Sequence, residues 1–172
     1  MIQILKKGVK IYKGETIMRF TLAALLVCLS SSLEAHAPVI NDGQAPMTLE
    51  YPFDIEEPEH SKAIFSELKS EPHYYKIVSQ EKFRFYAGLT APKLDGCALK
   101  QTFDLRILDG NKEEVDKRNG KSGEWWPWYE EYGKTWYWVG PEVGKEFKSD
   151  RVYQAGTYFI EVSNQTNTGK YV

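Results

Sequence analysis

The chain of 172 residues has little cysteine, no long apolar run and no excess of basic charge. Its two cysteines are Cys28 and Cys97, and Cys28 lies in the N-terminal segment, so no disulfide is expected within the folded part. The most apolar stretch, residues 20–29, is shorter than the roughly 20 residues that a helix needs to cross a bilayer. Neither a disulfide-stabilised scaffold nor a membrane-spanning helix is therefore expected.

Motifs of common catalytic sites are also missing. The chain has no G-x-S-x-G, no H-E-x-x-H and no glycine-rich phosphate loop. Glu130 and Glu131 are adjacent, and adjacent residues of a strand point to opposite faces. They cannot by themselves form the facing carboxyl pair, about 5–9.5 Å apart, that a glycosidase needs. The sequence predicts neither an enzyme nor a cofactor.

The N-terminal segment has the three parts of a secretory signal peptide. Arg19 precedes the apolar run, small polar residues follow it, and Ala35 and Ala37 offer cleavage points. Cleavage after Ala35 is favoured slightly, because cleavage after Ala37 would leave Pro38 next to the cut. Residues 18–35 are therefore interpreted as a signal peptide, and the protein is expected to be exported to the periplasm or the medium.

Met18 is the expected start of translation. Lys13-Gly14-Glu15 can be encoded by AAA-GGA-GAA, which resembles a bacterial ribosome-binding site shortly before the Met18 codon. Residues 1–17 are then an untranslated upstream extension, and the source is bacterial.

The expected mature chain, residues 36–172, carries 17 Lys or Arg and 22 Asp or Glu, a net charge of −5. A nucleic-acid partner needs a basic face, and an anionic membrane surface attracts basic clusters, so neither is expected. A chain of this length suits one domain. Its first part, residues 36–59, is rich in proline and acidic residues and is interpreted as an extended lead-in.

The body of the chain has the alternating pattern of half-buried strands. Alternation covers residues 82–89, 102–107 and 157–163, and aromatic or β-branched residues dominate 74–78 and 136–139. Residues 61–68 are compatible with a short helix or a strand. Residues 111–124 are charged and contain glycine, which predicts a mobile loop. Short strands separated by turns predict an all-β, jelly-roll-like antiparallel β-sandwich over residues 60–172.

Several segments resemble bacterial pre-peptidase C-terminal-like domains. They are SKAIFSEL (61–68), YYKI (74–77), FRFY (83–86), AGTYFIEV (155–162) and GKYV (169–172). The resemblance implies a jelly-roll-like β-sandwich that accompanies secreted proteins, is generally non-catalytic, and has relatives that bind polymers such as collagen, sometimes with calcium. This chain departs from the family pattern because it has no attached peptidase and carries a long aromatic insertion.

In that family the last strand normally continues beyond the position of Val172. The sequence therefore predicts a truncated product, whose last strand lacks backbone partners. Some similar proteins continue into a C-terminal membrane helix, so any membrane contact of this protein is expected only through such a missing anchor.

All five tryptophans lie within residues 125–138. One interpretation is a ligand platform, in which aromatic rings stack on sugar rings or proline-rich chains and Glu130 accepts hydrogen bonds. The other is core packing, because Trp136 and Trp138 alternate with Tyr137 and so share one face of a strand. The candidate ligand-binding residues are Trp125, Trp126, Trp128, Tyr129, Glu130, Trp136 and Trp138.

Two metal sites are conceivable. His36, as a new N-terminus, could chelate copper through its amine and imidazole, together with His60 or His73. An acidic stretch, Asp54, Glu56, Glu57 and Glu59, could offer oxygen ligands to calcium, but its spacing matches no known ligand loop and a solvated segment is favoured.

These patterns together predict an exported, non-catalytic binding or accessory domain that recognises a polysaccharide or a protein at the cell surface. One alternative is a structural domain of a larger, membrane-anchored extracytoplasmic protein. The second alternative is a copper-binding periplasmic protein that uses His36.

Overall fold

The computed structural model describes residues 37–172 except Asp42, Gln44, Ala45, Glu59, Asp95, Cys97 and Phe147. Within this part of the chain the structure contains no helix, and so none that could cross a membrane. The strands are β1 (Ala37–Ile40), β2 (Phe53–Asp54), β3 (Lys62–Lys69), β4 (His73–Ser79), β5 (Ala87–Pro92), β6 (Asp104–Leu108), β7 (Glu114–Arg118), β8 (Trp126–Glu130), β9 (Thr135–Val143), β10 (Gly156–Ser163) and β11 (Thr168–Tyr171).

The first layer is a five-stranded sheet in the order β2-β4-β10-β6-β7, antiparallel except for the short parallel pair of β2 with β4. β10 lies at its centre, where Ile160 is opposite Tyr75 on one side and Ile107 on the other. The next residue, Glu161, points to the outer face. Glu161 is buried there and accepts a hydrogen bond from Arg106 Nε at 3.1 Å. The central strand is therefore covered on both faces.

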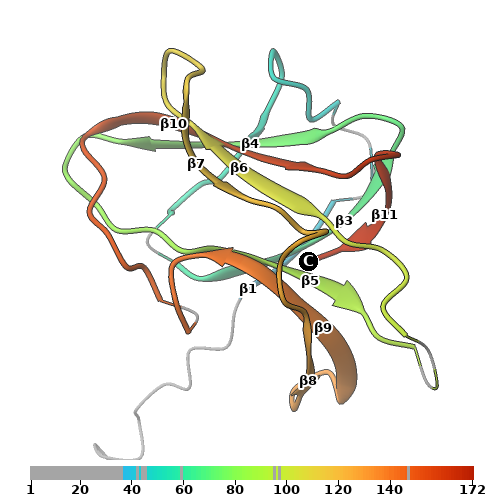
Figure 1. Cartoon of the computed structure of the whole chain (residues 1–172). Helices are drawn as coiled ribbons and strands as arrows, with labels where there is room; N and C mark the ends of the chain where they lie inside the picture. Colours follow the sequence, from blue (N-terminus) through green and yellow to red (C-terminus); the bar gives the residue numbers. More distant parts are fainter. Residues whose placement is uncertain are drawn as a thin grey trace, which may run out of the picture. The chain divides into compact units, whose positions relative to one another are not determined.

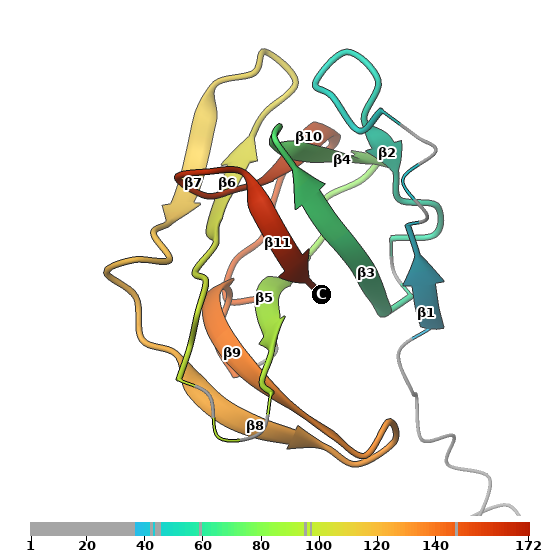
Figure 2. The ribbon, with the colours of Figure 1, turned by 90° about the vertical axis from the view of Figure 1, so that its right-hand side faces the viewer.

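The second layer is built from two three-stranded sheets, β1-β3-β11 and β5-β9-β8. The backbone N–H groups of Thr90 in β5 and of Val172 donate to each other's carbonyl oxygens, at 2.8 and 2.9 Å. This reciprocal pair joins the two sheets edge to edge, in the order β1-β3-β11-β5-β9-β8. Figure 1 shows the five-stranded sheet above β5, β9 and β8, and Figure 2 shows β11 beside β3 with its end close to β5.

The inner faces of the two layers enclose one hydrophobic core. Phe103, fully buried just before β6, contacts the ring of Tyr171 in the other layer, with the ring centroids 5.5 Å apart. Among the described strands, only the β6–β7 and β8–β9 connections stay within one layer, and the others cross between layers. The predicted fold class, an all-β, jelly-roll-like antiparallel β-sandwich, is therefore confirmed.

Most predicted strands are present. The segments 74–78, 102–107, 136–139 and 157–163 fall in or beside β4, β6, β9 and β10, and residues 61–68 form β3 rather than a helix. The prediction of one strand over residues 82–89 is only partly right, because Phe83 pairs with Tyr153 as an isolated bridge and β5 begins at Ala87. Phe83 and Phe85 still point inward, since both pack against the Tyr153 ring.

The prediction of a mobile loop over residues 111–124 is wrong, because this segment contains β7. Asp109 Oδ1 accepts the backbone N–H groups of Asn111 and Glu113, at 2.8 and 3.0 Å, and closes the turn between β6 and β7. In β7 itself, Asp116 forms ion pairs with Arg118 and with Arg151 of the β9–β10 connection. Charged residues are typical of exposed loops and also of edge strands, where they discourage pairing with other chains.

The segment interpreted as a lead-in is extended, and it also contributes to the folded unit. It supplies β1 and β2, its Met47 side chain is buried, and the Met47 backbone carbonyl accepts the backbone N–H of Tyr74 at 2.8 Å. At the other end of the chain, the last strand was predicted to lack backbone partners, yet both backbone groups of Val172 bond to Thr90.

Gly120 connects β7 to the aromatic segment at a point with no room for a side chain. Its N–H donates to Asp104 Oδ1 at 2.7 Å, and its carbonyl accepts the indole N–H of Trp125 at 2.8 Å. A Cβ atom at this position would overlap the backbone of Phe103. The close approach of these two backbones therefore requires glycine.

We expect Gly120→Ala to destabilise the protein by about 1–3 kcal/mol, because the added methyl group forces the two backbones apart. Gly110→Ala is the matched control, since its Cβ would lie 3.5 Å from the Thr157 carbonyl oxygen, an ordinary contact. Urea unfolding of both variants measures the difference. Equal unfolding midpoints would show that the close approach of Gly120 to the Phe103 backbone does not limit the stability of the protein.

Candidate functional site

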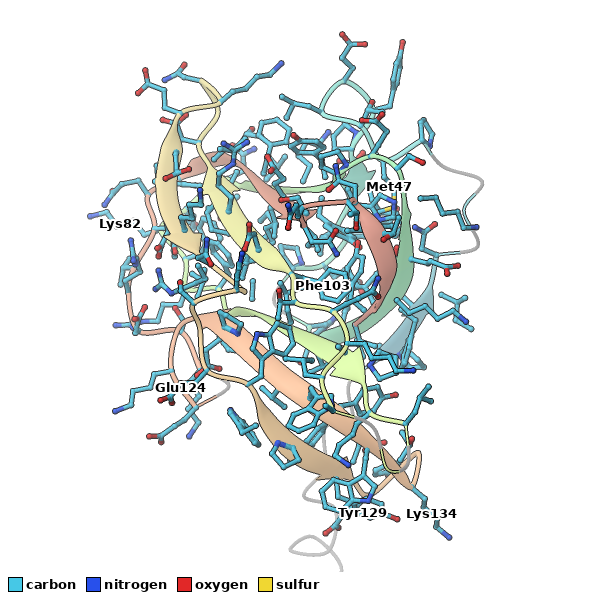
Figure 3. All side chains as sticks on the ribbon, turned by 45° about the vertical axis from the view of Figure 1, so that its right-hand side comes forward. Met47, Lys82, Phe103, Glu124, Tyr129 and Lys134 are labelled. Atoms are coloured by element: carbon cyan, nitrogen blue, oxygen red, sulfur yellow. The ribbon has the colours of Figure 1, made fainter. Side chains whose placement is uncertain are left out.

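β8, the turn at residues 131–134 and β9 form a hairpin that we call the aromatic hairpin. Glu130 shapes its turn, because its carboxylate accepts the backbone N–H groups of Tyr132, at 2.8 Å, and of Gly133. Lys134 takes a left-handed conformation with a φ of 51°. Figure 3 shows Tyr129 and Lys134 at the end of the hairpin that is distant from Phe103.

The strand register divides the aromatic residues between two faces of the hairpin, because directly opposed residues point to the same side. One face, which we call the Lys93 face, carries Pro127 opposite Trp138 and Tyr129 opposite Trp136. On it the backbone N–H of Lys93 donates to the Trp136 carbonyl at 3.0 Å, which continues the pairing of Ala91 with Trp138. The other face, the Trp126 face, carries Trp126, Trp128, Glu130, Tyr137 and Val139.

Trp125 stands apart from both faces. It precedes β8, packs against the core, and donates its indole N–H to the Gly120 carbonyl. A Cβ at Gly140 would overlap its indole ring, so the ring lies directly against the β9 backbone. Trp125 therefore has the geometry of the core-packing interpretation, and so does the half-buried Trp138.

The Lys93 face combines exposed rings with a cation. The side chains of Tyr129 and Trp136 are 39% and 43% exposed, and their ring centroids lie 5.2 Å apart at an interplanar angle of 55°. The Lys93 ammonium lies over two indoles, 5.7 Å from the Trp136 centroid and 5.5 Å from that of Trp138. Such cation–π contacts are attractive because the face of an indole carries negative partial charge.

The Trp126 face is flatter. Trp128 and Tyr137 lie side by side, with ring centroids 6.4 Å apart and an angle of 32°, and Trp126 is 42% exposed. Burial, and to a lesser degree the charge of Glu130, raises the pKa of Tyr137. Tyr137 therefore presents a neutral hydroxyl at physiological pH.

The structure brings together only part of the residue set predicted from the sequence. Tyr129, Trp136 and Trp138 share the Lys93 face, whereas Trp126, Trp128 and Glu130 lie on the opposite face. Lys93 was missed, because it precedes Trp136 by 43 positions and only the pairing of β5 with β9 brings it close. Alternation continued from β5 predicts that Lys93 shares a face with Ala91, but the sequence pattern does not identify the strand that pairs with this segment.

Those of the residues considered for metal binding that the structure describes do not converge. His36 and Glu59 lie outside the described residues, His60 Nδ1 lies 3.3 Å from Glu57, and Asp54 pairs with Lys76 at 2.7 Å. Within the described ranges, no three His, Cys, Asp or Glu side chains gather around one point.

His73 instead belongs to a chain of hydrogen bonds that we call the hydroxyl–histidine network. Its Nδ1 lies 2.8 Å from the Tyr171 hydroxyl and 3.1 Å from Ser66 Oγ. The Tyr171 hydroxyl is also 2.7 Å from that of Tyr75, and Asn41 donates to Ser66 Oγ at 2.9 Å. The network joins β4 of the first layer to β3 and β11 of the second.

Burial governs the protonation of this network. It raises the pKa of Tyr75 to about 12 and also raises that of Tyr171, so both tyrosines stay neutral. Burial, with a smaller effect from the charge of Lys69, lowers the pKa of His73. A groove of about 570 Å³ opens beside His73, but its charged residues, Lys69 and Lys170 with Glu67 and Glu71, balance in sign and indicate no ligand class.

Comparisons with protein-family models, with curated proteins and with solved structures found no match to this chain.

We expect the free energy of unfolding to fall as the pH drops below about 6.5, the ordinary pKa of histidine. The unfolded chain binds a proton at His73 that the folded chain does not, so stability is lost until the pH reaches the lowered pKa of the folded state. His73→Gln is expected to flatten this dependence, whereas His60→Gln, at an exposed histidine, is expected to preserve it. Urea unfolding between about pH 5.5 and 7.5 measures both; a profile unchanged by His73→Gln would rule out this role.

Acrylamide quenching is expected to divide the tryptophan fluorescence into two components. Trp126 and Trp136 are more than 40% exposed and should be quenched readily, whereas Trp125 is shielded by Gly140 and the core. The double substitution Trp126→Phe and Trp136→Phe should remove most of the quenchable signal. Uniform resistance to quencher in the folded wild type would mean that the hairpin is covered.

Proposed function

We propose that this protein is an exported, non-catalytic module that binds a polysaccharide or a protein at the cell surface through the Lys93 face of the aromatic hairpin. The observation that carries the proposal is the exposure of Trp136 and Tyr129 on a face that also presents Lys93. Aromatic rings that remain exposed beside a cation suit a ligand with both an apolar surface and polar groups.

Export and family are part of the same proposal. The signal-peptide pattern of residues 18–35 supports a periplasmic or extracellular location. The segments that resemble pre-peptidase C-terminal-like domains include YYKI and AGTYFIEV, and these contribute to β4 and β10 in the middle of the five-stranded sheet. A relative of those domains would be an accessory module rather than an enzyme.

The alternative of a structural domain is favoured by the packing of Trp125 and Trp138 against the core. Under that alternative the aromatic residues serve stability alone. Truncation of an exposed ring distinguishes the two functions. In a binding module it weakens ligand binding and leaves the fold intact, whereas in a purely structural domain there is no ligand binding to lose.

We expect Trp136→Ala to weaken binding to isolated bacterial cell envelopes by about tenfold or more, because exposed Trp and Tyr residues dominate such contacts. Tyr132→Ala is the control, since Tyr132 is the most exposed aromatic residue of the turn and lies on neither face. The protein is recovered from the extracytoplasmic fraction, where an N-terminus at His36 or Pro38 is expected. Cosedimentation before and after protease treatment of the envelopes separates a polysaccharide from a protein ligand.

Binding that is absent, or equal for wild type and Trp136→Ala, would contradict the proposal and favour the structural alternative. Loss of binding through Trp126→Ala alone would place the site on the opposite face. Urea unfolding of each variant excludes a general loss of stability as the cause.

A further inference from the structure

We infer that the Lys93 face recognises an acidic polysaccharide, whose sugar carboxylate pairs with Lys93 while the sugar ring packs against Trp136 and Tyr129. This inference rests on the proposed function and names the ligand class of the same site.

The position of Lys93 is fixed by the backbone. Its N–H bonds to the Trp136 carbonyl, so the residue lies opposite Trp136 as a continuation of β5, and the strand order places Lys93, Trp136 and Tyr129 in one row. The next row holds Ala91, Trp138 and Pro127. The ammonium group of Lys93 lies over the indoles of both rows. Its charge is therefore held at one edge of the exposed rings.

Within the part of the chain that the structure describes, that charge has no carboxylate partner, because none of the ion pairs includes Lys93. Glu130, the acidic residue paired in the β8–β9 register, belongs to the opposite face, and its carboxylate oxygens accept backbone N–H groups of the turn. An anionic group of a ligand would give Lys93 its counter-charge without competing with a protein carboxylate.

The rings beside Lys93 favour a sugar as the carrier of that anion. Tyr129 and Trp136 meet at an angle of 55°, so they form a shallow corner that suits one ring rather than a long flat surface. The C–H face of a pyranose packs against such rings, while its hydroxyls reach polar edges such as the Tyr129 hydroxyl. A neutral sugar would leave the ammonium group unpaired.

An acidic peptide is the competing ligand, and β8 disfavours its usual mode of binding. Extended peptides add to a sheet by bonding to the free backbone of an edge strand. β8 is the edge strand of this layer, and Pro127 in its middle has no N–H to offer. Contact through side chains of the Lys93 face, as for a sugar, does not need that edge.

The mature chain has a net charge of −5, so it repels polyanions overall. Attraction of an acidic polymer must then come from a local site. Loss of one cation on this face should therefore remove a large part of the preference for the acidic ligand.

The test compares polygalacturonate with its fully methyl-esterified form, in which a methyl group on each sugar carboxylate removes its charge, and adds hyaluronan as a second acidic polymer. Wild type is expected to bind the acidic forms about tenfold more tightly than the ester, the order of a hydrogen bond to a charged group. Lys93→Gln should remove this preference, Lys93→Arg should retain it, and Lys134→Gln, in the turn, should leave it unchanged. Raising salt from about 50 to 300 mM should weaken binding of the acidic forms only.

Equal binding of acid and ester, or a preference that survives Lys93→Gln, would overturn the inference while leaving the proposed function intact if Trp136→Ala still loses binding. No binding to either acidic polymer, or equal binding of poly-glutamate, would overturn the assignment to acidic polysaccharides. If Trp136→Ala leaves binding unchanged, that result would instead contradict the proposed function itself. Each variant is checked by urea unfolding against wild type.

Discussion

The register between β5 and β9 decides which side chains meet on the aromatic hairpin. Gly88 pairs with Glu142, but Thr90 pairs with Val139, so β9 gains one residue within this interval, where Gly140 and Pro141 lie opposite Leu89 alone. Had the register of Gly88 continued unchanged, Leu94 would lie opposite Trp136. The added residue brings Lys93 to that position instead.

The residues of β5 beside the bulge belong to the core. Leu89, which lies opposite it, is almost completely buried, and Ala91 also faces the core. A shift of one residue turns every later side chain of β9 to the other face, so the bulge puts Trp138 and Trp136 on the face that Ala91 and Lys93 share. Packing in the sandwich therefore holds the cation over the indoles, although Lys93 itself contributes little to the core.

Sequence patterns predicted the centre of this fold better than its edges. β4, β6 and β10 pack inward-facing residues such as Tyr75, Ile107 and Ile160 against the other layer, and that burial produces the period of two on which prediction depends. β7 is an edge strand held by Asp109 in its turn and by Asp116 in its ion pairs, and its composition cannot be distinguished from that of a solvated loop.

The candidate site shows the same division. The clustering of tryptophans is visible in the sequence, but the allocation of Trp125 to the core and of Trp136 to the surface depends on what lies opposite each residue. Gly140 leaves the space that the Trp125 ring occupies and the Gly120 carbonyl accepts the indole N–H, and neither glycine has a sequence signal that links it to Trp125. In the sequence Lys93 is only a lysine that follows a short strand, and the bulge in β9 brings it over two indoles.

Exposed aromatic surface on an edge hairpin is a hazard, because it invites association with other copies of the chain. Pro127 removes a backbone donor from β8, and Lys93 covers part of the two indoles with a charged group. Such features discourage association between edge strands, and they leave Tyr129 and Trp136 exposed to solvent. If the rings served packing alone, burial would be the simpler arrangement, and no cation beside them would be needed. Protection combined with continued exposure supports the proposal that this face is a binding surface.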